Sequence, residues 1–272
     1  MNRLANLLFA ILTLAALSSP AMAAGDTLAE IRQKGVLVAG VKDSLPPFGY
    51  IDEQTRRIVG YDVDFARAIA QKLGVRLELK PVSSASRIPQ LMERHIDIIV
   101  ATTSNTPQRR QQLDFSHAYF FTVQKFLVKK GTVKSVADLE KKKIGTAKGS
   151  DSEQNASEAL PSATILSFDD YPQAFLALQQ GKIFAVTTDE AILAGIRQKA
   201  PNKEKFEIPD FQIADEAYGI GMRKGDGALR DFVNKTLLEM EASGQAREIF
   251  EKWFGPQSAT PMKRTFTITA DK

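Results

Sequence analysis

Hydrophobic residues along the chain follow two spacings: short continuous runs typical of buried strands, and a three-to-four spacing typical of amphipathic helices. A capping box at Thr27 to Glu30 predicts a short helix that ends at Gly35. Asp62 is expected to cap a longer helix that ends at Gly74. The other elements expected in this half are a strand over 36–41, a hairpin over 50–60, a strand with Val75, Leu77 and Leu79 on one face, a helix over 87–94 with Ile88, Leu91 and Met92 turned inward, and a strand over 96–100.

The second half of the chain repeats this alternation of strands and helices. Such alternation favours an α/β fold with largely parallel sheets. The expected elements are strands over 125–129, 143–147, 164–168 and 183–187, helices over 151–160, 171–180 and 190–199, a short strand over 218–222, a helix over 227–243, and a last helix that ends with Trp253-Phe254-Gly255.

Two such series predict two lobes, each with its own sheet and core. The helices after residue 227 need a sheet to cover, and the second series already has helices of its own. We therefore expect the C-terminus to return to the first lobe, which makes two chain crossings and a hinge over a cleft. The expected boundaries are residues 24–118 and 218–272 for lobe 1, and residues 119–217 for lobe 2.

The N-terminus has the pattern of a secretory signal peptide over residues 1–23. Arg3 gives a positive start, an apolar run follows over 4–17, and Ala21-Met22-Ala23 is a small-residue cleavage site. A membrane anchor is the alternative, but the run is short for a bilayer. Because the chain contains no cysteine, it has no lipidation thiol and no disulfide. We expect a soluble protein in the periplasm that is not inserted in the membrane.

Composition excludes several function classes. The chain of 272 residues has 36 basic and 32 acidic side chains in interspersed order, which does not predict a nucleic-acid surface. Two histidines without ligand spacing and no cysteine make a metal site improbable. The chain has no Walker sequence and no G-x-S-x-G motif. We therefore expect no metal, no cofactor and no catalytic residue.

The start of the helix predicted after Thr106 is unusually basic. Thr106 and Pro107 suit an N-cap and a first helical position. Arg109 and Arg110 fall in the first turn, where the helix dipole disfavours cations unless an anion lies against them. One interpretation is a solvated basic helix end. The other is a carboxylate site in which Arg109 is joined by the hydroxyls of Thr102 and Ser104.

The loops that follow the predicted strands carry complementary charges. Ligands of open α/β sheets bind outside the carboxyl ends of the strands. The first lobe contributes cations there, and the second contributes hydroxyls and acids, which suits an amino-acid zwitterion. Each residue also has a purely structural interpretation: Lys42 and Arg87 as surface cations, Asp189 and Glu190 as helix N-terminal acids, and Ser150 and Ser152 as caps.

Six segments carry a resemblance to a known family across nearly the whole mature chain. They are SSASRIPQLMERHIDI (Ser83 to Ile98), the T-x-S-N-T-x-x-R pattern from Thr102 to Arg109, DFSHAYF (Asp114 to Phe120), TDEAILAG (Thr188 to Gly195), EAYGIGMRKGD (Glu216 to Asp226) and EKWFG (Glu251 to Gly255). In their order and spacing the sequence resembles the family-3 solute-binding proteins of polar amino-acid ABC transporters, and among them most the glutamate/aspartate-binding proteins. The fold that this resemblance implies is the two-lobed periplasmic binding protein (type II) fold.

The resemblance also implies roles for individual residues. Arg109, with Ser104 and Ser150, would bind the ligand α-carboxylate, and Asp189, with Thr102 nearby, would bind the α-ammonium. Ser84 and Arg87 would bind the side-chain carboxylate of glutamate or aspartate. Two positions depart from the family pattern: Lys42 replaces an arginine and loses its bidentate fork, and Tyr171 replaces a histidine and carries no charge. An acidic L-amino acid is the expected ligand, with glutamine, asparagine or another polar amino acid as alternatives.

The expected function is capture of this amino acid in the cleft and its delivery to an inner-membrane ABC permease, by a monomer that binds no nucleic acid. Two alternatives share the fold. A sensor domain is disfavoured because no membrane segment or catalytic domain follows EKWFG. A periplasmic dehydratase-like enzyme would need an acid with a raised pKa in the cleft, and Glu153 and Glu190 are the nearest candidates. Whether Phe48 or Tyr50 contacts the ligand is left open.

Overall fold

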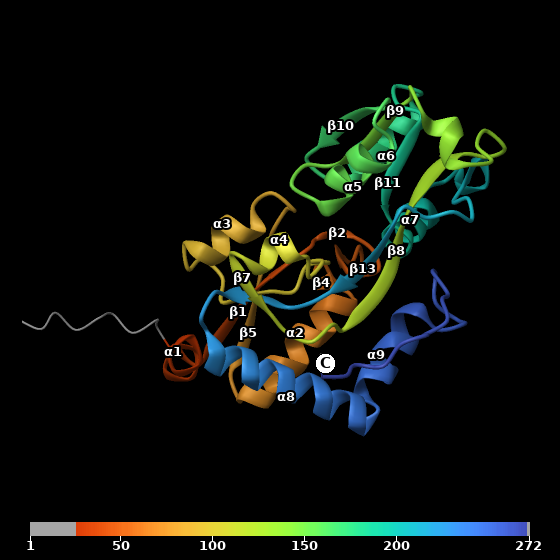
Figure 1. Ribbon diagram of the computed structural model, residues 1–272. Coiled ribbons are helices and arrows are strands. Elements are labelled where there is room, and N and C mark those ends of the chain that lie inside the picture. Colours follow the sequence, from red (N-terminus) through yellow and green to blue (C-terminus); the bar gives the residue numbers. More distant parts are fainter. Residues whose placement is uncertain (1–25, 271–272) are drawn as a thin grey trace, which may run out of the picture.

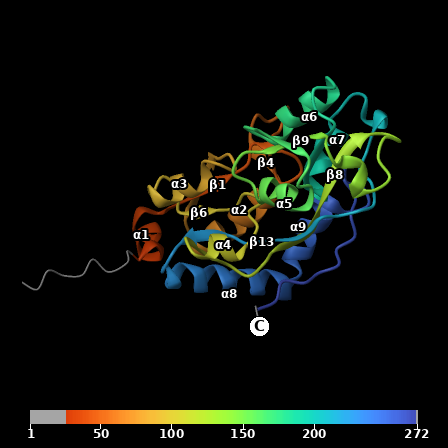
Figure 2. The same cartoon turned by 45° about the horizontal axis from the view of Figure 1, so that its top comes forward.

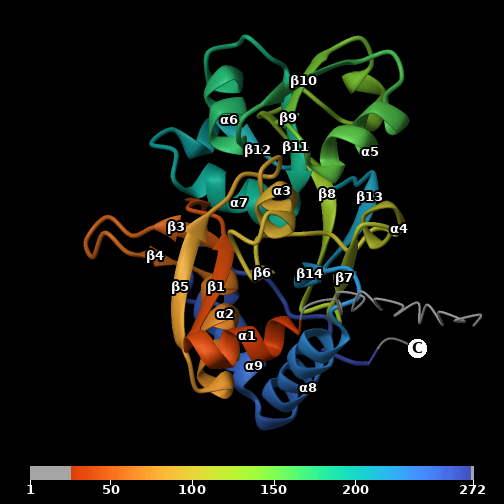
Figure 3. The same cartoon turned by 90° about the vertical axis from the view of Figure 1, so that its left-hand side faces the viewer.

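A computed structural model describes residues 26–270. The signal peptide predicted over residues 1–23 lies outside the described residues. Within the described part of the chain, no helix combines the length and the hydropathy needed to cross a bilayer. Two lobes, each built on one sheet, lie one above the other, and a pair of strands runs between them (Figures 1 and 3).

The first sheet has the strand order β5-β1-β6-β14-β7. Both β5 and β6 pair parallel with β1, and β14 pairs antiparallel with β6 and β7. The strands are β1 (Val36–Val41), β5 (Arg76–Pro81), β6 (Ile98–Ile99), β7 (Leu113–Phe115) and β14 (Gly221–Arg223).

Helices cover both faces of this sheet, so its central strands are buried. Ile98 and Ile99 of β6 point to opposite faces and join two different hydrophobic clusters. The two C-terminal helices pack on the second helix, α2 (Figure 1). The helices of this lobe are α1 (Thr27–Lys34), α2 (Tyr61–Leu73), α3 (Arg87–Met92), α4 (Pro107–Arg110), α8 (Gly227–Ser243) and α9 (Gln245–Phe254).

The second sheet has the order β10-β9-β11-β8-β12, with β13 also paired to β8. Parallel pairing of β9 with β10 and β11 leaves the loops after these strands at one edge, which faces the first lobe (Figure 3). Its elements are β8 (Phe120–Lys129), η1 (Val136–Leu139), β9 (Lys143–Ala147), α5 (Asp151–Ala159), β10 (Thr164–Phe168), α6 (Tyr171–Gln179), β11 (Ala185–Asp189), α7 (Glu190–Gln198), η2 (Lys203–Lys205), β12 (Phe206–Glu207) and β13 (Ala214–Tyr218).

Two neighbouring segments carry the chain between the lobes. The first leads from β7 into β8, and the second leads from β13 into β14. They are hydrogen-bonded to each other, because Ser116 N donates to Ile220 O at 3.0 Å and Tyr119 N donates to Tyr218 O at 2.9 Å. The single strand predicted over 218–222 is therefore wrong. The chain leaves one sheet at Tyr218 and enters the other at Gly221.

Several other local predictions are corrected by tertiary contacts. Asp26, not Thr27, caps α1 by accepting from Ala29 N at 3.1 Å. Asp62 lies inside the first turn of α2, which Gly60 caps, and its carboxylate points into the protein. Met92 is 53% exposed rather than inward. The strand expected over 96–100 is shortened to two paired residues, although all five are buried.

An aromatic cluster fills the space under the crossing segments. The ring of Phe48 contacts those of Tyr61, Phe120, Tyr218 and Phe254 at centroid distances of 5.0 to 6.0 Å. Phe48 is fully buried in this cluster, so its ring belongs to the core. Edge-to-face contacts of this kind add about 0.5–1.5 kcal/mol per pair beyond burial. The crossing segments are therefore packed against a tightly filled aromatic core.

The C-terminal tail after α9 lies back along the first lobe. Met262 N donates to Phe254 O at 2.8 Å, and Ile268 N donates to a carboxylate oxygen of Glu241 on α8 at 3.1 Å. Between these points, the Phe266 ring lies 5.7 Å from the ring of Phe120 at the start of β8. The tail thus reaches the crossing from the side of the C-terminal helices.

A small sheet bridges the two lobes on one side of the cleft. The strands β2 (Ser44–Leu45), β3 (Gly49–Ile51) and β4 (Ile58–Val59) form the predicted hairpin and its extension. The turn between β2 and β3 contains the cis Pro46-Pro47 bond and packs against α7 of the second lobe. A Cβ atom placed on Gly195 of α7 would lie 1.8 Å from Pro46 O. The helix and the turn therefore meet backbone to backbone.

This contact generates the first prediction. Alanine is preferred over glycine inside a helix by about 1 kcal/mol, but at position 195 the added methyl must push the turn away. We expect Gly195→Ala to lower the free energy of unfolding by about 1–3 kcal/mol, measured by urea denaturation of the ligand-free protein.

Gly227→Ala at the start of α8 is the matched control. A Cβ there meets nothing closer than an Arg230 nitrogen at 3.9 Å, so its unfolding free energy should be unchanged or higher. A Gly195→Ala protein as stable as the Gly227→Ala protein would contradict a close contact between α7 and the turn.

Candidate functional site

Residues from both lobes converge where the strand ends of the two sheets face each other. The nine side chains singled out in the sequence all lie in this region, and eight of them are buried while Ser150 is half-buried. Burial of so many polar groups in one place is unusual for a surface. The eight are Lys42, Ser84, Arg87, Thr102, Ser104, Arg109, Tyr171 and Asp189.

Arg109 and Arg110 separate the two interpretations of the basic helix start. Thr106 caps α4 as predicted, since its hydroxyl accepts from Arg109 N at 3.2 Å. Arg110 is exposed and donates to Asn105 Oδ1 at 2.7 Å. Arg109 is 8% exposed and turns toward the second lobe. The solvated helix end therefore describes Arg110, whereas the Arg109 guanidinium meets an anion.

The anion beside Arg109 is Asp151, the first residue of α5 in the opposite lobe. Arg109 Nη1 donates to Asp151 Oδ2 at 2.5 Å and to Ser104 O at 3.2 Å, and Nη2 donates to Gly149 O at 3.3 Å. Figures 2 and 3 show α4 below the start of α5. Sequence reasoning did not select Asp151, because an acid in the first turn of a helix is already explained by the dipole.

Asp189 is a buried carboxylate with one free oxygen. Its Oδ2 accepts from the Tyr218 hydroxyl, while Oδ1 is buried and has no hydrogen-bond partner among the described residues. Burial, followed by the nearby Glu216 carboxylate, raises the pKa of Asp189 well above its usual value. A buried unpaired carboxylate oxygen is costly, so this position favours a cationic or hydrogen-bond-donating ligand group.

Glu216 is a second buried acid in the cleft and was not selected from the sequence. It lies on β13 next to the crossing, and Asn155 Nδ2 donates to its Oε1 at 2.9 Å. Burial raises its pKa, and a hydrogen bond with Ser104 opposes the shift. Glu153 and Glu190, the acids expected from sequence, bind Gly149 N and Lys125 Nζ instead. The signal that could have found Glu216 is its position just before a predicted crossing.

Arg87 and Asp62 hold the loop that carries Thr102. Arg87 Nη1 donates to Ala101 O, Thr102 O and Thr103 Oγ1 at 2.8 to 3.1 Å. Thr102 has a φ of +47°, in the left-handed region, and its N–H donates to Asp62 Oδ2 at 2.9 Å. The Nη1 group of Arg87 is thus committed to the backbone of this loop.

Lys42 lies at one end of a pocket of about 270 Å³ between the lobes. Its Nζ donates to Ser84 Oγ at 2.9 Å. Burial, with a smaller contribution from the Arg87 guanidinium, lowers the pKa of Lys42 well below its usual value. Tyr171 also lines this pocket, and its hydroxyl donates to Ser152 Oγ at 3.3 Å. The acidic residues that also line the pocket are Asp43, Asp169 and Asp170.

The hydroxyl of Ser150 is hydrogen-bonded within its own loop. Ser150 Oγ donates to Ala147 O at 2.6 Å and lies 3.3 Å from Thr146 Oγ1. Ser150 occupies the N-cap position of α5, but its side chain makes no capping bond. The role expected for Ser150 toward a carboxylate stays a prediction.

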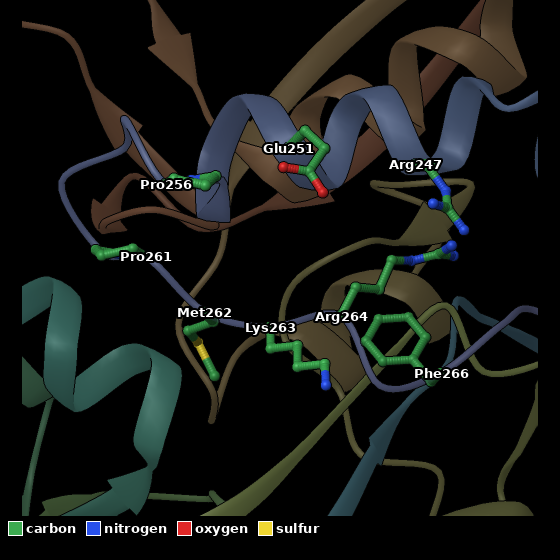
Figure 4. Close-up of a pocket in the computed structure, with 8 residues that line it drawn as sticks. All are labelled: Arg247, Glu251, Pro256, Pro261, Met262, Lys263, Arg264 and Phe266. Carbon is green, nitrogen blue, oxygen red and sulfur yellow. The ribbon is translucent and has the colours of Figure 1, made fainter.

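A larger pocket of about 500 Å³ lies away from the cleft, between α9 and the C-terminal tail. Figure 4 shows the side chains of Arg247 and Arg264 ending close to each other beside Phe266. Arg264 is paired with Glu241 of α8. All of these residues belong to the C-terminal segment of one lobe, so the pocket does not combine charges from both lobes as the cleft does.

Within residues 26–270, no group of three or more histidine, aspartate or glutamate side chains is placed to hold a metal ion. The polar groups of the cleft are instead arranged as opposite charges at separate points. Arg109 provides donors at one point and Asp189 an acceptor at another. This arrangement suits the binding of a small molecule that carries both an anionic and a cationic group.

Comparison with known proteins agrees with this geometry. The model of the bacterial extracellular solute-binding proteins, family 3, matches residues 37–256. The chain is 39% identical to the ABC transporter glutamine-binding protein GlnH of Bacillus subtilis, over 90% of this chain and 93% of that protein. It is 34% identical to the glutamate/aspartate import solute-binding protein of Escherichia coli, over 89% of this chain and 83% of that protein. An ancestral arginine-binding protein bound to glutamine has a similar structure, with a TM-score of 0.77 and 40% identity. The match covers 81% of this chain and 98% of that one.

Asp62 generates a prediction on pH dependence. Burial raises the pKa of Asp62 to about 7, against the hydrogen bonds from Tyr119 and Thr102. Between the ordinary aspartate pKa and 7, the folded state keeps a proton that the unfolded state has lost, so stability falls as the pH rises. The slope of about 1.4 kcal/mol per pH unit applies from pH 5 up to the folded pKa of about 7, so Asp62 lowers the free energy of unfolding by roughly 3 kcal/mol between pH 5 and pH 8.

Asp62→Asn removes the titration. We expect the wild-type protein to lose more unfolding free energy than the variant between pH 5 and pH 8, measured by urea denaturation at both values. Asp189 and Glu216 titrate in the same direction in both proteins, so their contributions cancel in the difference, which reports Asp62 together with its effect on the neighbouring Lys42. Equal losses in the two proteins would contradict the raised pKa of Asp62.

Proposed function

Because the chain belongs to the bacterial extracellular solute-binding proteins of family 3, we propose that it captures a polar L-α-amino acid between its lobes and delivers it to an ABC permease. The proposed place of action is the periplasm, after removal of the signal peptide predicted over residues 1–23. The observation that carries the proposal is the buried, unpaired Oδ1 of Asp189 in the same cleft as the Arg109 guanidinium. An α-ammonium and an α-carboxylate would satisfy these two groups together.

Capture requires the lobes to move apart, because the cleft residues are buried in the form described. The proposed hinge is the pair of crossing segments, where two short stretches connect the sheets. A ligand that contacts Arg109 from the first lobe and Asp189 from the second favours the closed form by its contacts with both. The permease would then receive the closed form, and a monomer suffices for this cycle.

The lining of the pocket beside Lys42 favours a side chain that both donates and accepts hydrogen bonds. Three carboxylates line it beside the single amino group of Lys42. A carboxamide can accept from Lys42 and donate to Asp170, whereas a carboxylate would face like charges. We therefore place glutamine ahead of the glutamate or aspartate expected from sequence.

Titration calorimetry tests this order of preference. The purified mature protein is unfolded and refolded to remove carried-over ligand, then titrated with L-glutamine, L-asparagine, L-glutamate and L-aspartate. Tighter binding of glutamine than of glutamate supports the carboxamide pocket. Tighter binding of the two acids would mean that Lys42 is charged in the complex and that the preference predicted from sequence is right.

Arg109 generates the central mutational prediction. Arg109→Ala removes the partner of a desolvated ligand carboxylate, so we expect affinity for every amino acid tested to fall by at least about a hundredfold. Arg110→Ala removes the same charge from the neighbouring, exposed position and should bind normally. Near-normal affinity of the Arg109→Ala protein in calorimetry would contradict the assignment of Arg109 as the residue that binds the ligand carboxylate.

A second candidate function is a dehydratase-like enzyme on the same fold, which Glu216 favours because it is a buried acid with a raised pKa. One similar structure is the ancestral amino acid-binding protein AncCDT-1, described as a precursor of cyclohexadienyl dehydratase, with a TM-score of 0.76 and 32% identity over 84% of this chain and 99% of that one. We expect no product when the protein is incubated with prephenate or arogenate. Product formation that Glu216→Gln abolishes would establish the enzyme instead.

A further inference from the structure

An ion pair between the lobes occupies the group that the ligand carboxylate needs. Arg109 Nη1 and Asp151 Oδ2 lie 2.5 Å apart, and their side chains are 9% and 17% exposed. The pair joins α4 of the first lobe to the first residue of α5 in the second (Figures 2 and 3). Because both partners are largely removed from water, screening by salt is weak and the pair holds the lobes together.

Asp151 is chemically equivalent to the proposed ligand group. A guanidinium offers a carboxylate a planar set of N–H donors, and here Nη1 is directed at the Asp151 carboxylate and Nη2 at Gly149 O. The remaining contact of Nη1 goes to Ser104 O within the first lobe. Both N–H groups of Nη1 are therefore in use, so a ligand carboxylate that binds Arg109 through Nη1 must displace the carboxylate of Asp151.

The local structure places Asp151 at this point. Gly149 has a φ of +73°, and a Cβ added to it would lie 2.9 Å from the Cα of Ala85 in the first lobe. The loop before α5 can come this close to the other lobe because it has glycine there. The helix dipole favours a negative charge at the first position of α5. Asp151 thus faces Arg109 across the empty cleft.

We propose that Asp151 is an internal competitor of the ligand: its carboxylate binds Arg109 in the empty cleft, keeps the empty protein closed, and must leave before an amino acid can bind. This inference rests on the proposed function, since it needs Arg109 to be the carboxylate-binding residue. Asp151 then sets the affinity of the receptor without contributing to the bound complex. Its effect is to weaken binding and ease release of the amino acid.

The affinity of an Asp151→Asn protein tests the competition. The amide has nearly the same shape but cannot form the ion pair, so we expect the Kd for L-glutamine to fall by about tenfold or more relative to the wild-type protein. Glu153→Gln is the matched control, because it removes one negative charge from the same helical turn, and its side-chain oxygen can still accept from Gly149 N. Its Kd should equal that of the wild-type protein. An Asp151→Asn protein that binds no tighter than wild type overturns the inference and leaves the proposed function standing.

A distance measurement on the empty protein tests the closure independently of any ligand. The chain has no cysteine, so Met92→Cys on α3 and Leu176→Cys on α6 introduce two label sites, each 53% exposed in the native chain. Spin labels at these sites should give a short distance in the empty wild-type background and a longer or broader one with Asp151→Asn. L-Glutamine should restore the short distance in the Asp151→Asn background and leave the wild-type distance short.

The two measurements separate the failures. If Asp151→Asn leaves the distance in the empty protein unchanged, Asp151 does not hold the lobes together and the inference fails whatever binds. If the distance lengthens but neither protein binds any amino acid in calorimetry, the proposed function fails. The inference then fails too, because Asp151 has no ligand with which to compete.

Discussion

Charged groups that are removed from water must be paired, and in this protein the partners come from different lobes. Arg109 belongs to the first lobe, while Asp151 and Asp189 belong to the second. The buried Arg109 has its acidic partner only across the cleft, so this charge is paired only when the lobes are together. Closure, ligand capture and selectivity are therefore consequences of one electrostatic requirement, and the hinge serves to let the partners meet and separate.

The hinge combines freedom at one point with rigidity around it. The two crossing segments are hydrogen-bonded to each other, so they form one strip rather than two separate linkers. Beneath them, Phe48 and Tyr61 of the first lobe and Phe120 at the start of β8 form part of a continuous aromatic cluster. Glu216 and Tyr218 lie on the strand that enters this strip, which places two cleft residues directly at the axis of movement.

Much of the fold follows from the sequence because its signals are local. The apolar runs over 36–41 and 143–147 coincide with β1 and β9, and the Thr106-Pro107 start of α4 is confirmed. The strand predicted over 218–222 is wrong because sheet membership changes between Tyr218 and Gly221, which no local period reveals. Asp62 was assigned to a helix cap by its type and position, whereas its partners Thr102 and Tyr119 are distant in sequence.

The site shows the same limit, since Asp151 and Glu216 have ordinary local explanations and gain their importance only from the opposite lobe. The C-terminal tail adds a different kind of control. It lies beyond the region matched by the family model, and Phe266 rests on Phe120 and Phe121 at the root of the crossing strip. A substitution in this tail can therefore change how tightly the crossing strip is packed while the side chains of the cleft keep their positions.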